Sequence, residues 1–347
     1  MPQSTLVAMS GGVDSTVAAM LALRDCPDCA GAVMKLHPCA ADCETDARAA
    51  ARKLGIPLYV FDFSGSFASQ VVEPFVSAYI EGRTPNPCVD CNKHIKFGQF
   101  LEKALELGKD YIATGHYARV EQDGNGRFLL KKGADLLKDQ SYVLYSLTQN
   151  QLAHTLFPLG GLSKKQAREI ARDAGLENAD RRESQDICFI PDGDYAGFIV
   201  GHTGVEPRKG RFIDADGNHL GEHGGVIHYT VGQRRGMGLA MPYPAYVLKV
   251  SPEDDTVVVG KNDMLYTRTL YAKNINLIPI DKLASPLRAR VKIRYKHAEQ
   301  PATVHQTGDD ALRIDFDEPQ RALTKGQAAV IYDGETVIGG GTITIVT

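Results

Sequence analysis

Hydrophobic positions fall into two alternating patterns from residue 1 to about residue 115. Short apolar runs, typical of buried strands, are separated by stretches whose apolar residues recur at helical spacing. The runs expected to form strands are Leu6–Met9, Ala32–Leu36, Leu58–Phe63 and Tyr111–Ala113. The stretches expected to form helices are Val17–Leu23 and Asp46–Leu54. Strand and helix in turn predict βαβ units, and therefore an α/β fold built on a doubly wound parallel sheet.

The pattern changes twice further along the chain. Residues 141–175 lose the strand pattern, and the stretch after Ser163 is typical of a capped helix with a basic face, closed by Gly175. From about residue 205 onward, short strands separated by glycines predict a small β-rich domain and then a β-barrel. These strands are expected at Gly210–Ile213, Val247–Val250, Thr256–Val259, Arg290–Arg294, Ala328–Tyr332 and Thr342–Val346. We therefore predict three domains, at residues 1–200, 201–270 and 271–347.

Composition narrows the class of protein. No stretch approaches the roughly 18 apolar residues of a membrane span, and the N-terminus lacks the features of a signal peptide. We therefore expect a cytoplasmic protein with no membrane partner. Seven cysteines make structural disulfides improbable there and favour metal ligands or catalytic thiols. The net charge of −3 argues against non-specific coating of nucleic acid, although a sum hides any local basic face.

A glycine-rich loop, Ser10-Gly-Gly-Val-Asp-Ser15, joins the first expected strand to the first expected helix. Gly11 and Gly12 let the backbone approach a ligand, and the helix that follows directs its positive end at the same place, which favours phosphate. The loop lacks the Gly-Lys-Ser/Thr ending of a Walker A sequence. It resembles the pyrophosphate loop of ATP pyrophosphatases, which implies cleavage of ATP between its α and β phosphates. Asp14 would then help to place Mg²⁺. A tight turn without a ligand is the alternative.

Two cysteines, Cys88 and Cys91, follow a stiff segment that contains two prolines. We expect a helix to begin after Cys91. A thiol at a helix N-terminus, close to Lys93 and Lys96, should have a lowered pKa, which predicts Cys91 as a nucleophile. The alternative is a small apolar side chain packed in a turn.

The other cysteines carry less information by themselves. Cys188 taken alone is typical of a buried core residue. Cys26, Cys29, Cys39 and Cys43 form two pairs around one expected strand, a spacing that allows a zinc site. The first pair falls where the first helix should end, so ordinary packing or incidental thiols are the favoured interpretation.

Several sequence blocks, in order along the chain, carry a close resemblance to a known family. They are Ala8–Ser15, Gly82–Lys93, Ala113–Arg119, Lys138–Tyr142, Glu183–Ile190, Tyr229–Gly236 and Gly339–Gly341. Together they resemble the bacterial tRNA-specific 2-thiouridylases, which are similar in their N-terminal fold to adenine nucleotide α-hydrolases. The resemblance implies that ATP adenylates the C2 oxygen of the wobble uridine in tRNA. Sulfur from a cysteine desulfurase or a sulfur-relay protein would arrive as a persulfide on Cys188. Cys91 would attack or resolve it, leaving a Cys91–Cys188 disulfide.

The resemblance also implies binding residues. For ATP they are Ala8, Met9, Ser10, Gly11, Gly12, Val13, Asp14, Ser15, Met34 and Gly115. For tRNA they are Asn86, Pro87 and Cys88 near the target base, with His116, Lys138, Asp139, Gln140, Arg294, Tyr295 and Gln327. A place in the core would suit Met34 equally well.

One departure from the family leaves two chemistries open. Many members of the family carry Asp at the position of Cys88. Three thiols, on Cys88, Cys91 and Cys188, could instead hold a [4Fe–4S] cluster with one iron open to sulfide. That redox-neutral route would replace the persulfide.

Basic residues also indicate nucleic-acid binding, independently of the family resemblance. Arg288, Arg290, Lys292 and Arg294 alternate, so on a strand they would share one face. Arg234, Arg235 and the helix residues Lys164, Lys165, Arg168 and Arg172 add further patches. Tyr117, Tyr142 and Tyr295 are candidates to stack on a flipped base. A solvated charged face is the alternative. Two other functions also stay open, another adenylating synthetase or amidotransferase of the same loop family and a redox or Fe–S protein.

Overall fold

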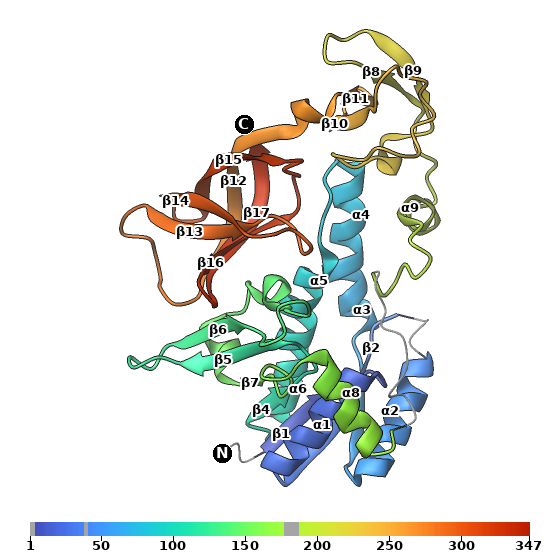
Figure 1. Ribbon diagram of the computed structural model, residues 1–347. Helices are drawn as coiled ribbons and strands as arrows, with labels where there is room; N and C mark the ends of the chain where they lie inside the picture. The colour runs from blue at the N-terminus through green and yellow to red at the C-terminus, as the bar shows by residue number, and fades with distance from the viewer. Residues whose placement is uncertain (1–3, 38–40, 177–186) are drawn as a thin grey trace.

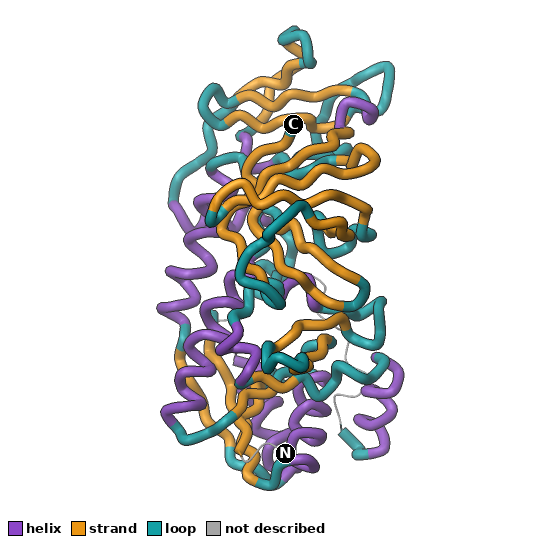
Figure 2. Tube along the Cα trace, turned by 90° about the vertical axis from the view of Figure 1, so that its left-hand side faces the viewer, coloured by secondary structure: helices purple, strands orange, loops and turns teal. Residues whose placement is uncertain are grey.

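The computed structural model describes residues 4–37, 41–176 and 187–347. An α/β domain with its N-terminal sheet forms one end of the molecule, a small β domain forms the other, and a β-barrel lies beside the helices that connect them (Figure 1). The turned view shows a helical column along one edge, with the barrel strands next to it (Figure 2). Among the described residues, no helix has the length and apolar character needed to cross a membrane.

The N-terminal sheet has five parallel strands in the order β3-β2-β1-β4-β7. The strands are β1 (Ser4–Ala8), β2 (Asp28–Lys35), β3 (Leu58–Asp62), β4 (Tyr111–Ala113) and β7 (Thr155–Leu156). The helices around it are α1 (Val13–Asp25), α2 (Ala41–Leu54), α6 (Phe100–Glu106), α7 (Gln149–Ala153) and α8 (Lys164–Asp173). Small residues line α1, so it packs closely on both the sheet and α8. The expected doubly wound sheet is confirmed, because the order reverses between β1 and β4.

A column of helices leads from this sheet to the rest of the molecule (Figure 1). Its segments are α3 (Ser64–Phe67), the π-helical Ala68–Val72, α4 (Glu73–Ile80), α5 (Pro87–Asp90) and the π-helical Cys91–Gln99, which continues into α6. Its aromatic side chains pack on Phe189 and Phe198, so the segment around α9 (Tyr195–Thr203) is held against α4. The sulfur-bearing residues Cys88 and Cys91 thus belong to one continuous helical run.

The small domain is a four-stranded sheet in the order β10-β11-β8-β9. Its strands are β8 (Gly210–Ile213), β9 (His219–His223), β10 (Tyr246–Ser251) and β11 (Thr256–Gly260). The C-terminal strands are β12 (Tyr266–Leu277), β13 (Leu287–Lys292), β14 (Gln300–Gly308), β15 (Ala311–Arg321), β16 (Ala328–Asp333) and β17 (Thr336–Val346). Pairing of β12 with β17 closes these six strands into the expected barrel around a separate core.

The predicted domain boundaries differ from the element boundaries. Residue 200 lies inside α9, and residue 270 lies inside β12. The predicted strand Arg290–Arg294 is shifted, because β13 ends at Lys292. These differences arise because no proline- or glycine-rich linker marks either junction in the sequence.

One pairing between domains was not predicted. The hairpin of β5 (Ala118–Gln122) and β6 (Phe128–Lys132) belongs to the first domain, yet β6 joins the barrel sheet at β17 through Thr336. The backbone N–H of Lys132 donates to the carbonyl of Glu335, and the Asn276 amide donates to the carbonyls of Tyr145 and Leu147. The barrel is therefore fixed on the α/β domain by backbone hydrogen bonds as well as by packing.

Candidate functional site

The residues implied in nucleotide binding meet at the carboxyl edge of the parallel sheet. The loop from Ser10 to Ser15 follows β1, Met34 lies near the end of β2, and Gly115 follows β4. Ligands of open α/β sheets bind at this edge, where the strand order reverses. Met34 is only partly buried, so its side chain can serve both the core and a ligand.

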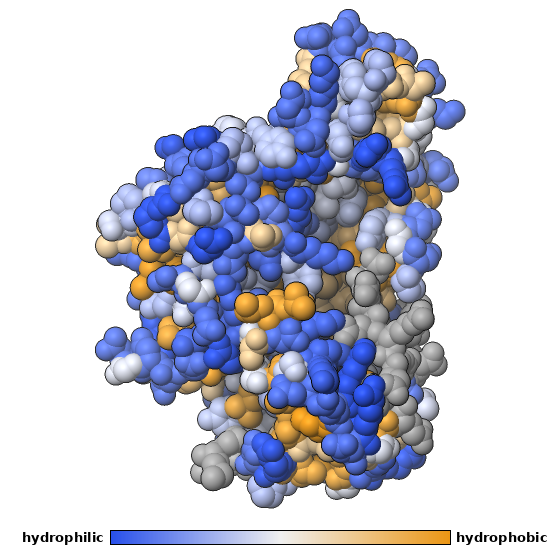
Figure 3. Space-filling view, in the orientation of Figure 1, coloured by the Kyte–Doolittle hydropathy of each residue, from blue (hydrophilic) through white to orange (hydrophobic). Residues whose placement is uncertain are grey.

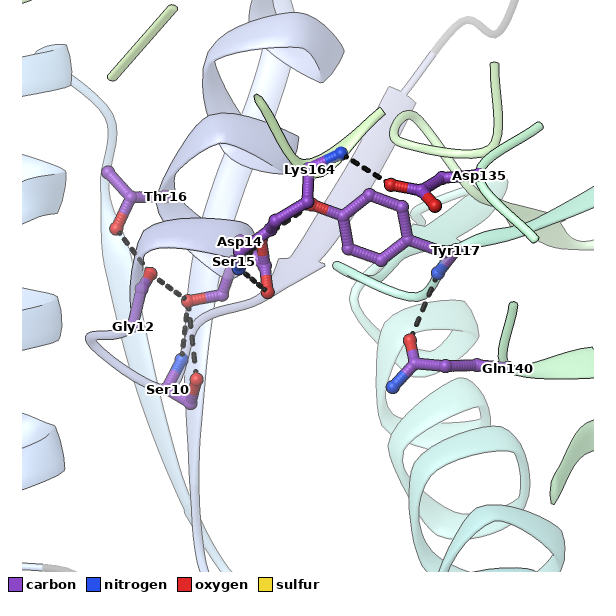
Figure 4. Close-up of polar contacts among 9 residues, drawn as sticks. All are labelled: Ser10, Gly12, Asp14, Ser15, Thr16, Tyr117, Asp135, Gln140 and Lys164. Carbon is purple, nitrogen blue, oxygen red and sulfur yellow. Dashed lines mark hydrogen bonds and ion pairs between the residues drawn. The ribbon is translucent and has the colours of Figure 1, made fainter. Parts of the chain in front are cut away.

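Internal hydrogen bonds hold the loop in shape (Figure 4). The Ser15 hydroxyl donates to the carbonyl of Gly12 at 2.9 Å and accepts from the backbone N–H of Ser10 at 3.1 Å. The Thr16 hydroxyl donates to the same Gly12 carbonyl at 3.0 Å. No side chain caps the N-terminus of α1, and Ser10 is exposed. The loop therefore presents a helix N-terminus to solvent, as anion binding requires.

Two glycines are required by the backbone around the loop. Gly11 has φ of 74°, and a Cβ there would lie 2.4 Å from the Cβ of Asp46 on α2. A Cβ on Gly115 would lie 2.9 Å from the backbone of Asp14. The loop is therefore enclosed by α2 on one side and by the end of β4 on the other.

Asp14 makes contacts that the sequence did not predict (Figure 4). The Nζ of Lys164 lies 2.8 Å from each carboxylate oxygen of Asp14, and the Tyr117 hydroxyl donates to one of them at 2.8 Å. Lys164 is buried at the start of α8, so its predicted place in a basic surface patch was wrong. Tyr117 is 3% exposed, which also excludes the predicted stacking on a base. The basic helical pattern gave no signal that its first lysine turns inward.

The cysteine helix begins earlier than predicted. The side chain of Asn86 caps α5 by accepting from the backbone N–H of Cys88, and Pro87 occupies the first turn. Cys91 therefore lies inside a continuous helical run, not at its N-terminus.

The predicted low pKa of Cys91 was also wrong. Burial raises the pKa of Cys91 to about 12, and the positive charge of Lys96 opposes this only in part. Cys91 is 8% exposed, so removing the thiolate from water costs more than the nearby cation returns. At neutral pH this thiol is protonated.

The structure brings the three candidate thiols into electrostatic contact. Cys88 and Cys188 both raise the pKa of Cys91, and Cys88 raises the pKa of Cys188. Burial raises the pKa of Cys88 and of Cys188 as well, although both side chains reach solvent. All three cysteines are free. The residues before Cys188 in its motif, Glu183–Asp186, lie outside the described part of the chain.

The positive charge of Lys96 acts on all three of these thiols. Its charge lowers the pKa of Cys88, Cys91 and Cys188, against the larger effect of burial. It also acts on the ring of His116, which follows Gly115 at the loop. The charge of one lysine thus reaches both the thiols and the segment after β4 that borders the glycine-rich loop.

Removing the charge of Lys96 should make the thiols less reactive. In Lys96→Met we expect the alkylation of the exposed thiols, Cys88 and Cys188, to require a higher pH than in the unchanged protein. Lys93→Met is the matched control, because the charge of Lys93 acts on Asp90 instead. Alkylation rates followed by mass spectrometry across pH measure the shift. Superimposable profiles for both variants and the unchanged protein would contradict the role of Lys96.

The barrel contacts the segment that leads into the cysteine helix. The Gln327 amide donates to the carbonyl of Thr84 at 2.9 Å, and the Thr84 N–H donates to the carbonyl of Lys325 at 2.9 Å. Gln327, expected to contact tRNA, thus has an internal partner. The contact places the barrel loop directly beside Asn86 and Cys88.

Several other residues expected at tRNA are held inside the protein. His116 is 9% exposed, bonded to Thr114 at 2.8 Å, and burial lowers its pKa well below its usual value, so the ring is uncharged. Asp139 is 8% exposed and accepts three hydrogen bonds, from Gly133 and Ser141. These placements do not fit the expected RNA contacts. The sequence could not show this, because the polar residue types that hold a loop in shape are the same types that bind a ligand.

Other residues of that set remain accessible. Lys138 is partly exposed, and the Gln140 side chain accepts from the Tyr117 N–H. Arg294 is partly exposed and Tyr295 is 37% exposed, just beyond β13. On the face that Figure 3 draws, hydrophilic side chains cover most of the surface outside the grey residues.

Two of the four residues of the predicted basic strand face, Arg288 and Arg290, have acidic partners. Arg288 and Arg290 are exposed on β13 as expected, but Arg288 pairs with Asp317 at 2.7 Å and Arg290 donates to the carbonyl of Glu299. Tyr142 is fully buried and donates to the carbonyl of Ala328, so its predicted stacking on a base was wrong. A solvated, paired face is the better interpretation of this strand.

The N-terminal cysteines show no metal site in the described residues. Cys26 and Cys29 are buried, and burial raises the pKa of Cys29 to about 11, as expected for packed thiols. Cys39 lies outside the described residues. In the described ranges, no three His, Cys, Asp or Glu side chains are arranged to hold a metal ion.

Comparison with known proteins covers the whole chain. Three family models match it: a tRNA methyl transferase HUP domain at residues 3–192, a tRNA methyl transferase PRC-barrel domain at 197–261 and an aminomethyltransferase β-barrel domain at 267–343. The tRNA-specific 2-thiouridylase MnmA of Clostridioides difficile is 46% identical, over 99% of this chain and 98% of that protein. Its namesake from Acetivibrio thermocellus is also 46% identical, over 98% and 99% of the two chains. Among solved structures, an NMN synthetase from Francisella tularensis covers 53% of this chain and 67% of its own, at 15% identity and a TM-score of 0.34.

Proposed function

The chain belongs to the tRNA-specific 2-thiouridylase family, and from that premise we propose that it replaces the C2 oxygen of the tRNA wobble uridine with sulfur, using ATP. One observation carries the proposal. The charge of Lys96 acts on Cys88, Cys91 and Cys188 and also on His116, whose neighbour Gly115 packs against Asp14 of the glycine-rich loop. One lysine charge therefore reaches both the thiols and the segment that borders the loop suited to phosphate, which supports an exchange of oxygen for sulfur at one site.

The nucleotide half of the reaction activates the oxygen. A uridine carbonyl is a poor electrophile, and its oxygen is a poor leaving group. Attack of the C2 oxygen on the α phosphate of ATP forms an adenylated uridine and releases pyrophosphate. In this proposal, the N-terminus of α1 and the loop Ser10–Ser15 hold the pyrophosphate, and Asp14 helps to hold Mg²⁺. The Mg²⁺ would supply charge neutralisation for the departing phosphates.

The sulfur half completes the exchange. The terminal sulfur of a persulfide on Cys188, delivered by a sulfur-relay protein or a desulfurase, forms a bond to C2, and AMP leaves with the former uridine oxygen. Cys91 then attacks the Cys188 sulfur as its proton passes to the departing sulfur of the base, which forms a Cys91–Cys188 disulfide and releases the thiolated base. A dithiol reductant must return two electrons before the next cycle. Burial keeps Cys91 protonated at rest, which protects the persulfide from premature attack.

A [4Fe–4S] cluster on Cys88, Cys91 and Cys188 is the alternative sulfur chemistry. Such a cluster would hold sulfide on an open iron and would form no disulfide. The charges of Cys88 and Cys188 both act on Cys91, so the three thiols belong to one group. We propose the persulfide route, with Cys88 as an accessory thiol near the target base. The iron and sulfide content of anaerobically purified, active protein distinguishes the two routes.

The products test the proposed function. With ATP, Mg²⁺, unmodified tRNA and a sulfur donor, we expect AMP, pyrophosphate and 2-thiouridine in equal amounts. Nucleoside mass spectrometry and nucleotide chromatography measure all three. Thiolation should vanish when tRNA lacks a wobble uridine. ADP and phosphate as products, or AMP formation that does not depend on tRNA, would overturn the proposal and favour a different adenylating enzyme.

A further inference from the structure

A buried lysine stands behind the acidic residue of the glycine-rich loop. The Nζ of Lys164 lies 2.8 Å from both carboxylate oxygens of Asp14 (Figure 4). The Lys164 side chain is 11% exposed, whereas that of Asp14 is 30% exposed. A ligand that enters from solvent therefore meets Asp14 first, with Lys164 covered behind it.

Independent contacts fix the position of this lysine. Lys164 is the first residue of α8, whose N-terminus is closed by a capping box between Ser163 and Gln166. Its backbone N–H donates to the Asp135 carboxylate at 3.0 Å. Ala167 and Ala171 pack the same helix against α1. The helix α8 thus fixes the position of the Lys164 ammonium group, and the helix α1 fixes that of the Asp14 carboxylate.

Tyr117 supplies the second support of Asp14. Its hydroxyl donates to one Asp14 oxygen at 2.8 Å, and the Nζ of Lys164 lies 5.9 Å from the centre of its ring. A carboxylate held by a cation and a hydroxyl has one orientation, whereas a free aspartate samples several rotamers. Lys164 and Tyr117 together therefore hold the Asp14 carboxylate in one orientation beside the loop.

The location of the pair indicates a ligand-related role. Burying an ion pair costs desolvation energy that apolar residues of the same size would avoid. Here Asp14 lies in the first turn of α1, beside the backbone that is suited to phosphate. Lys164 offsets the negative charge that Asp14 alone would present to a polyanion at that place.

We propose that Lys164 is a positioning residue of the Mg²⁺–ATP site, which holds the Asp14 carboxylate in one orientation and offsets its negative charge beside the terminal phosphates. The inference rests on the proposed function for its ligand. It assigns Lys164 no part in breaking or forming bonds. Its effect should appear in nucleotide and Mg²⁺ affinity, and not in the affinity for tRNA.

The test is a binding measurement. Lys164→Met keeps the length of the side chain and removes its charge. Using α,β-methylene-ATP, which cannot be split between those phosphates, we expect its dissociation constant to rise at least ~10-fold and more Mg²⁺ to be needed for half-saturation. Lys164→Arg should recover part of the loss. Lys165→Met is the matched control, because Lys165 is exposed on the next position and should bind the analogue normally.

The outcomes separate this inference from the function. If the unchanged protein binds the analogue with Mg²⁺ and Lys164→Met binds equally well, the role of Lys164 is overturned and the function is not. If the unchanged protein binds the analogue but never thiolates tRNA, the proposed function fails. Thermal unfolding of Lys164→Met with and without the analogue excludes misfolding. A variant that is destabilised alone, but gains as much stability from the analogue as the unchanged protein, has lost only a structural ion pair, which also overturns the inference.

Discussion

Cys91→Ser is expected to lower the rate of repeated tRNA thiolation by ~10³-fold or more, because it removes the group that releases the product from Cys188. The ATP half should survive, because Cys91 has no part in the proposed adenylation. With a sulfur-loaded protein, the variant should trap tRNA on Cys188 through a disulfide. Addition of dithiothreitol should then release 2-thiouridine. Gel mobility of labelled tRNA with and without reductant measures the trap.

The neighbouring thiol provides the matched control for this result. Cys88 is also on the helical run, but it is exposed and has no resolving role in the persulfide route. Cys88→Asp and Cys88→Ser should therefore keep most of the activity, whereas Cys188→Ser should lose it. Loss in all three cysteine variants, with iron and sulfide in anaerobically purified protein, would favour the cluster. Full activity of Cys91→Ser would contradict both sulfur routes.

Features that depend only on neighbouring residues could be predicted from the sequence. The strand, the glycine-rich turn and the helix from Leu6 to Leu23 follow from neighbouring residues, and the structure has them as predicted. The pKa of Cys91 depends on what covers the thiol, which includes residues distant in the sequence. Its direction was therefore predicted wrongly from the nearby lysines.

Contacts between distant segments account for the other differences. Lys164 is 150 residues from Asp14 in sequence, so no spacing could reveal the pair. The hairpin β5–β6 lies within the sequence of the first domain. Only its pairing with β17 shows that it joins the barrel sheet. Gln327 likewise bonds to Thr84, far away in the chain. The family resemblance named most of these residues but not their internal partners.

The other large effect is expected for Gly11→Ala in the nucleotide loop. Gly11 has φ of 74°, which costs an alanine roughly 1–2 kcal/mol. The new Cβ would also lie 2.4 Å from the Cβ of Asp46 and 3.1 Å from the carbonyl of Cys43. Neither atom can rotate away, because both are fixed to the backbone of α2. The loop must therefore move, and a displacement of about 1 Å at a reacting group costs ~100-fold in rate.

A variant of a second glycine, Gly55, distinguishes the effect of this clash from the effect of backbone strain. Gly55 has φ of 70°, but a Cβ there meets nothing within 4 Å. Gly55→Ala should therefore lower the melting temperature through strain alone and leave tRNA-dependent AMP formation unchanged. Gly11→Ala should lose ~100-fold of that activity, with thiol alkylation at Cys188 unaffected, because the sulfur half remains folded. Equal AMP formation by the two variants would show that the loop tolerates displacement, and the assignment of Ser10–Ser15 as the nucleotide site would then be wrong.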